Sequence, residues 1–78
     1  MEKLTVKQKM VLEAIEWFID EHGYSPTQRE LASILKCGTR PIFEKLYVLE
    51  EKGYIKTQMG KSRTIKVLRG VDYADSIK

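Results

Sequence analysis

The chain has 78 residues, of which 42% are hydrophobic and 32% charged, and its formal net charge is +3. This length suits one small domain, and the composition is typical of a folded globular protein rather than a disordered segment. No run of the sequence approaches the ~18 apolar residues of a membrane span, and the N-terminus has no apolar signal-peptide core. Because Cys37 is the single cysteine, an internal disulfide is excluded, and we expect a cytoplasmic, nucleoid-associated protein of a prokaryote or phage.

The positive charge is concentrated in one part of the chain. Residues 1–38 carry five Lys/Arg against six Asp/Glu, residues 39–69 carry eight against three, and residues 70–78 carry one against two. A nearly neutral scaffold with one basic segment is the charge pattern of a nucleic-acid-binding protein. A solvated charged surface would produce the same pattern, so other features have to decide between the two.

A first helix is expected after Thr5. Thr5 and Gln8 have the spacing of a capping box. One apolar stripe at helical spacing follows, formed by Val11, Leu12, Ile15, Phe18 and Ile19. Gly23 stands where a helix C-cap is expected, and Pro26 predicts a turn. Met10, Ala14 and Trp17 form a second stripe, for which we expect a cover.

Two further helices are expected on either side of a short turn. Thr27 and Glu30 form a second capping box, which begins a short helix with Leu31, Ala32, Ile34 and Leu35 as its apolar residues. This helix ends before Gly38, and a third helix is expected from about Arg40 to Lys52. Pro41 falls in the first turn of the third helix, where a missing N–H costs nothing. Two helices joined by a short turn with a glycine are typical of a helix-turn-helix.

Beyond Gly53 the apolar period changes from that of a helix to that of a strand. Strands are expected over 54–58 and 63–68, with a hairpin loop over 59–62. The predicted fold class is therefore mainly α with a small β-hairpin, a three-helix winged helix-turn-helix. We expect this domain to occupy residues 1–69, with residues 70–78 as a tail.

Helical geometry predicts which side of the third helix faces outward. Ile42, Leu46 and Leu49 fall on one side and should be buried. The opposite side then carries Arg40, Phe43, Glu44, Tyr47 and Glu51. The N-terminal half of a recognition helix is the part that reaches base edges in the major groove.

The outward residues have chemistry that suits DNA. Arg40 can donate two hydrogen bonds to guanine, Glu44 can accept one from cytosine, and Phe43 can pack on a thymine methyl group. Tyr47 lies about a turn further on and suits a phosphate. Exposed aromatic side chains are also ordinary surface residues or anchors of a protein interface, so this alternative stays open.

Other DNA contacts are expected outside the third helix. Lys61 and Arg63 lie on or beside the hairpin loop, where they can reach the minor groove or backbone, although a solubilising loop would have the same residues. Thr27 and Gln28 can offer N–H groups to a phosphate at the start of the second helix. We expect the hydroxyl of Thr27 to cap that helix, so its contact would come through the backbone.

Four spaced blocks of sequence resemble the N-terminal DNA-binding domain of LexA-type repressors. They are L-T-x-x-Q over 4–8, G-Y-S-P-T-x-R-E-L-A over 23–32, L-E-E-K-G-Y-I over 49–55 and S-R-T-I-K-V-L over 62–68. The resemblance implies a repressor-like winged helix whose third helix enters the major groove. It also implies that Thr39 through Glu44 form the reading segment and that Arg63 is the wing arginine.

The sequence departs from that family in two ways. The turn before the third helix is one residue shorter, and residues 40–43 do not reproduce the family's small and polar residues. The sequence also ends at Lys78, without the self-cleaving Ser/Lys domain that dimerises these repressors. We therefore expect regulation by concentration, by the tail or by a partner.

Three functions compete at this point. The first is sequence-specific binding of double-stranded DNA as a transcriptional regulator; the others are a protein-interaction winged helix, as in an anti-repressor, and a nonspecific nucleic-acid binder. Catalysis has little support, because His22 suits the end of the first helix and Cys37 suits a small plug in the core. No metal, cofactor, membrane or small-molecule substrate is expected. A homodimer through the first helix and the tail remains a hypothesis.

Overall fold

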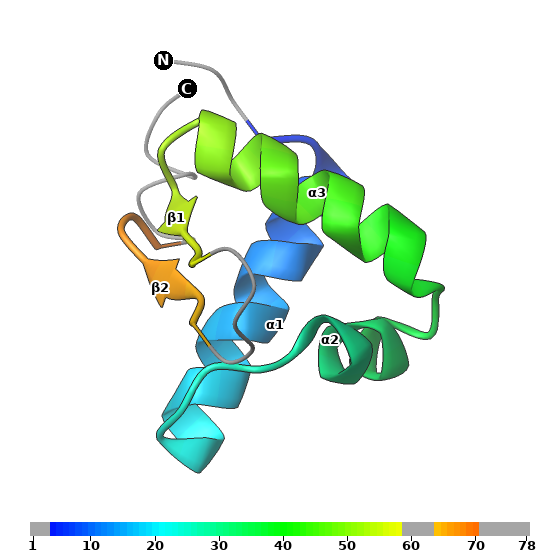
Figure 1. Cartoon of the computed structure of the whole chain (residues 1–78), viewed down its shortest axis with the longest axis vertical. Coiled ribbons are helices and arrows are strands. Elements are labelled where there is room, and N and C mark those ends of the chain that lie inside the picture. Colours follow the sequence, from blue (N-terminus) through cyan, green and yellow to red (C-terminus); the bar gives the residue numbers. More distant parts are fainter. Residues whose placement is uncertain (1–3, 59–63, 71–78) are drawn as a thin grey trace.

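The computed structural model describes residues 4–58 and 64–70 of the chain. Three helices are followed by two short strands: α1 (Val6–His22), α2 (Gln28–Leu35), α3 (Thr39–Glu51), β1 (Ile55–Lys56) and β2 (Lys66–Val67). The helices pack on one another, and the antiparallel strands lie beside α3 and α1 (Figure 1). The predicted fold, a three-helix winged helix-turn-helix, is confirmed.

Both expected capping boxes begin their helices. The hydroxyl of Thr5 accepts from the backbone N–H of Gln8 at 3.1 Å, and the Gln8 side chain accepts from the N–H of Thr5 at 3.0 Å. The same reciprocal pair joins Thr27 and Glu30 at 3.1 Å and 2.9 Å. Each box satisfies N–H groups that a helix leaves without partners at its start, which fixes where α1 and α2 begin.

The turn between α2 and α3 is closed by backbone hydrogen bonds. Lys36 adopts the left-handed conformation with φ of 55°, unusual for a residue with a side chain. The N–H of Cys37 then donates to the carbonyl of Ala32 at 2.9 Å. Gly38 is extended, and α3 begins at Thr39 and ends at Glu51, one residue earlier at each end than expected.

A single core joins all the helices to the hairpin. Its fully buried side chains include Leu12 and Ile15 of α1, Leu31 of α2, and Ile42 and Leu49 of α3. Burial of side chains of this size contributes roughly 1.5–3 kcal/mol each, so such a small domain depends on every one of them.

Tyr54 connects α3 to the hairpin. Its side chain is completely buried, and its carbonyl oxygen accepts from the N–H groups of Leu68 at 2.7 Å and Arg69 at 3.1 Å. The end of β2 is thereby held against Tyr54, which lies just beyond the end of α3. The backbone of Tyr54 therefore fixes the position of the hairpin relative to α3.

The strands are shorter than expected. Ile55 pairs with Val67 and Lys56 with Lys66, and the ladder stops there. Beyond Lys56, the Thr57 hydroxyl donates to the Glu50 carboxylate at 3.0 Å, and the N–H of Gln58 donates to the Thr64 hydroxyl at 3.1 Å. These side-chain bonds replace the ladder bonds that the expected strands over 54–58 and 63–68 required.

One expectation about burial is wrong, and a second, the cover over the second stripe of α1, stays a prediction. Cys37 is exposed and does not plug the core, because the chain reverses direction at Lys36 and carries the next side chain to the surface. In the second stripe of α1, Ala14 is buried in the core, whereas Met10 and Trp17 are exposed. The loop expected over 59–62 and the tail after Gly70 lie outside the described residues, and the domain limits stay a prediction.

Removing the Thr27 cap should destabilise the domain. We expect Thr27→Ala to lower the free energy of unfolding by about 1 kcal/mol, because the N–H of Glu30 loses its acceptor. Urea denaturation followed by circular dichroism measures the change. The neighbouring exposed residue supplies the control, Gln28→Ala, which should stay within about 0.5 kcal/mol of the parent. Equal stability of all three proteins would show that the cap contributes nothing.

Candidate nucleic-acid interface

The two sides of α3 differ as the sequence predicts. Ile42, Leu46 and Leu49 are buried against the core. The residues expected to face outward are all exposed: Arg40, Phe43, Glu44, Tyr47 and Glu51. We call the first four of these the reading face. Because burial of one side fixes the rotation of the helix about its axis, the reading face points into solvent.

The reading face exposes two aromatic rings one helical turn apart. Phe43 is 58% exposed and Tyr47 is 60% exposed. Aromatic side chains and arginine are enriched where a protein binds a partner, and Arg40 lies on the preceding turn. Leaving two rings in water costs free energy that a folded domain could avoid. This patch is therefore a candidate for contact with a partner.

The first turn of α3 lacks a side-chain cap. Gly38 stands at the N-cap position and has no side chain to accept from the N–H groups of α3, unlike Thr5 and Thr27 in the other helices. The first N–H groups of the helix, beginning at Thr39, thus remain available to an acceptor from a partner.

The other expected contact residues divide into two groups. At the start of α2, the hydroxyl of Thr27 is occupied by its cap, as expected, and the side chain of Gln28 is exposed. The structure brings this helix against α3. Lys61 and Arg63 lie outside the described residues, so their contacts stay predictions.

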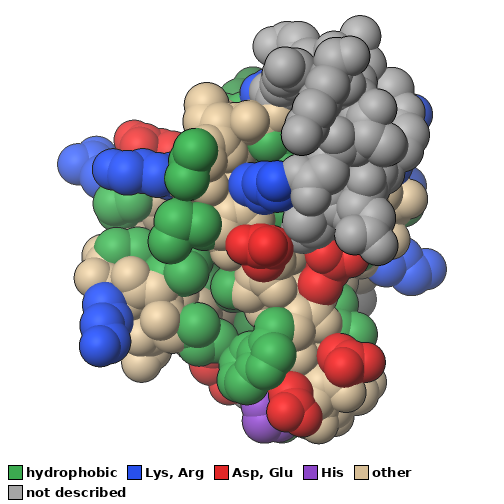
Figure 2. Space-filling view, turned by 180° about the vertical axis from the view of Figure 1, so that it is seen from behind, with side chains coloured by type: hydrophobic (Ala, Val, Ile, Leu, Met, Phe, Trp, Pro, Cys, Tyr) green, Lys and Arg blue, Asp and Glu red, His purple; other side chains and the backbone are tan. Residues whose placement is uncertain are grey.

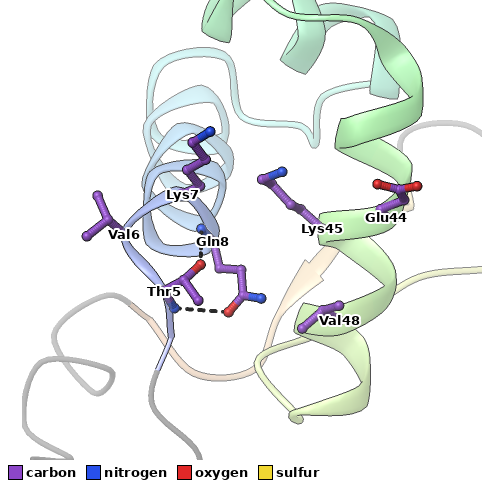
Figure 3. A pocket seen from close by; sticks show the side chains of 7 residues that line it. All are labelled: Thr5, Val6, Lys7, Gln8, Glu44, Lys45 and Val48. Carbon is purple, nitrogen blue, oxygen red and sulfur yellow. Dashed lines mark hydrogen bonds between the residues drawn. The ribbon is translucent and has the colours of Figure 1, made fainter.

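A pocket between α1 and α3 adds two basic residues that the sequence analysis missed. It is lined by Thr5, Val6, Lys7, Gln8, Glu44, Lys45 and Val48. Figure 3 shows the side chain of Lys45 extending from α3 toward α1, where Lys7 lies along the facing helix, and Glu44 of the reading face is next to Lys45 on α3. The Lys52 ammonium donates to Gln8 at 3.1 Å and so holds the start of α1 beside α3.

This pocket depends on a contact between residues far apart in the sequence. Lys7 and Lys45 belong to separate helices, and no local pattern links them. The sequence contains only a weak indication of this pocket. Lys45 directly follows Glu44 on α3, so the side chain of Lys45 lies at the flank of the reading face.

The outer side of the hairpin places two lysines opposite each other. Lys56 and Lys66 form a cross-strand pair, and both are exposed. Like charges directly opposite in an antiparallel pair are destabilising, and an anionic partner would relieve this repulsion. The hairpin thus provides a second basic edge beside α3.

Residues 4–58 and 64–70 contain neither a metal site nor a membrane-spanning helix. In this part of the chain, no group of three or more His, Cys, Asp or Glu side chains is arranged to hold a metal ion. No helix there has the length and apolar character needed to cross a membrane.

Comparison with known proteins agrees with the geometry. Residues 1–64 match the model of the LexA DNA-binding domain. A LexA repressor of Geotalea uraniireducens is 46% identical over 78 residues, covering 99% of this chain and 38% of the relative. A LexA repressor of Thermotoga neapolitana is 42% identical over 71 residues, covering 91% of this chain and 36% of the relative.

The chain therefore spans little more than a third of the length of these relatives. The family match, by contrast, covers most of the chain and includes all three helices and the first strand. This chain belongs to the LexA DNA-binding domain family.

Proposed function

We propose that this domain binds double-stranded DNA and regulates transcription, with the reading face of α3 in the major groove. The observation that carries the proposal is the exposed row of Arg40, Phe43, Glu44 and Tyr47 on a helix whose other side is buried. The major groove admits an α-helix, and its base edges offer a distinct pattern for each base pair. Membership of the LexA DNA-binding domain family and the repressors among the relatives support this function.

Each side chain of the reading face has a separate role in this proposal. The guanidinium of Arg40 donates two hydrogen bonds to O6 and N7 of a guanine. The carboxylate of Glu44 accepts from N4 of a cytosine, and the ring of Phe43 packs on a thymine methyl group. Tyr47, one turn further along, donates to a phosphate.

Phosphate contacts on both sides of the groove would position α3. Lys7 and Lys45 lie at the pocket beside Glu44, and Lys56 and Lys66 lie on the hairpin. The N–H groups at the starts of α2 and α3 serve a phosphate in the same way. Lys61 and Arg63, which lie outside the described residues, are proposed from the sequence to contact the backbone or the minor groove.

A protein-interaction domain is the second candidate, favoured by the exposure of Phe43 and Tyr47. The two functions differ in their salt dependence. A protein interface dominated by these rings would respond weakly to salt, whereas DNA binding releases counterions for each phosphate that is engaged.

Replacing Arg40 should relax base preference. We expect Arg40→Ala to cost about 1–3 kcal/mol at one or two base pairs and little at the others, because a bidentate contact to guanine is lost. Selection from a random duplex pool followed by affinity measurement on single-base variants provides the test. Glu51→Ala, an exposed change at the far end of α3, is the control. An equal loss of affinity on every duplex would make Arg40 a phosphate contact instead.

Replacing the pocket lysines should weaken binding without changing base preference. With six or so phosphates engaged, we expect log K against log salt to have a slope of about −5 for the parent protein. Lys7→Gln and Lys45→Gln should each lower affinity uniformly across duplexes and reduce the slope by about 1.

The matched control for this experiment is Lys36→Gln, in the turn before α3. Lys36 is exposed and lies outside the pocket. A slope near zero for the parent protein, with tight binding to a protein partner, would favour the second candidate. If both pocket variants have the same salt slope as the parent protein, Lys7 and Lys45 do not contact DNA.

A further inference from the structure

The side of α1 that faces away from the core carries three apolar side chains and one glutamate, and within residues 4–58 and 64–70 the apolar ones remain largely exposed to solvent. Val6, Met10, Glu13 and Trp17 recur at spacings of four, three and four residues, and we call them the outer face of α1. Val6 is 77% exposed, Met10 48% and Trp17 51%. A row with this alternation is the seam along which two helices pack.

The charges beside the outer face are segregated along the helix. Lys7 and Lys9 lie in the first turns of α1, whereas Glu16, Asp20 and Glu21 lie in its second half. Figure 2 shows acidic side chains gathered around apolar ones at the lower end of the molecule, where Figure 1 places the C-terminal half of α1. The two halves of the face therefore differ in sign.

This arrangement is unfavourable for α1 taken by itself. The N-terminus of a helix has a partial positive charge and the C-terminus a partial negative charge, so cations are favoured in the last turn and anions in the first. The first turn of α1 has no acidic residue, and both lysines lie near it, while Asp20 and Glu21 lie in the last turn together with His22. A second α1 helix packed antiparallel would place its carboxylates beside these lysines and would offset this unfavourable interaction.

We propose that the outer faces of α1 from two copies of this chain pack antiparallel about a two-fold axis. Met10 of one copy then lies against Trp17 of the other. In the same alignment, Lys9 faces Asp20, because in antiparallel helices each flank meets the same flank of its partner. A parallel alignment would bring lysines against lysines and carboxylates against carboxylates.

A second copy fits this face because a two-fold interface must be complementary to itself. The change from basic to acidic side chains along α1 meets that condition. Met10 and Trp17 meet it as well, because each packs on the other residue in the second copy. Glu13 lies next to the axis and faces its own counterpart, which limits the strength of the dimer. The reading face belongs to α3 and shares no residue with the outer face, so the dimer leaves it free.

The association is tested on the full 78-residue chain without DNA, by sedimentation equilibrium at loading up to about 1 mM. We expect the average mass to rise from the monomer value of 9.1 kDa toward twice that value. Trp17→Ser should abolish the rise. Tyr47→Ser is the matched control, because Tyr47 is an aromatic residue of similar exposure on α3, and it should leave the rise unchanged.

Charge exchange tests the antiparallel alignment. Asp20→Lys and Lys9→Asp should each weaken the dimer by about tenfold, since the altered contact occurs twice per dimer. The double variant should recover the parent affinity, and Glu13→Gln should strengthen the dimer. Circular dichroism verifies that each variant is folded, since Glu13 and Asp20 are exposed on α1 whereas Lys9 is partly buried.

Three results would overturn the proposal. The first is a parent protein that remains monomeric over the whole concentration range, which would leave the face to a different partner. The second is loss of the dimer in Tyr47→Ser but not in Trp17→Ser, which would place the interface on α3. The third is a double charge variant whose dimer is no tighter than the dimer of either single variant, which would exclude the antiparallel alignment.

Discussion

The burial of one side of α3 is the interaction on which the rest of the structure depends. Ile42, Leu46 and Leu49 enter the core formed by α1, α2 and the hairpin, and none of them retains appreciable contact with water. A helix fixed along one side has no freedom to rotate, so the opposite side is fixed as well. The exposure of Phe43 and Tyr47 is thus a consequence of the core.

The elements around α3 are held relative to it by a few specific bonds. The N–H of Cys37 ends α2 on the carbonyl of Ala32, Tyr54 anchors the second strand through its carbonyl oxygen, and Lys52 joins the start of α1. These bonds place a basic pocket on one flank of α3 and the paired lysines of the hairpin nearby. In the proposed complex with DNA, base contacts and backbone contacts therefore come from separate parts of the domain.

Features set by neighbouring residues were predictable from the sequence, and features set by distant contacts were not. Both capping boxes and the two sides of α3 follow from spacing alone, so they were predicted correctly. The exposure of Cys37 depends on the left-handed conformation of Lys36, which no residue type there demands. The pocket depends on the approach of α1 to α3, and the short strands depend on the carboxylate of Glu50.

The central claim is that the reading face of α3 contacts DNA while the outer face of α1 does not. Amide chemical-shift mapping of the labelled domain during titration with a duplex tests it most directly. We expect perturbations to concentrate at Thr39 through Tyr47 and at Lys7, with the amides of Glu13 and Trp17 unchanged. Perturbations centred on Met10 and Trp17, with α3 unchanged, would contradict it.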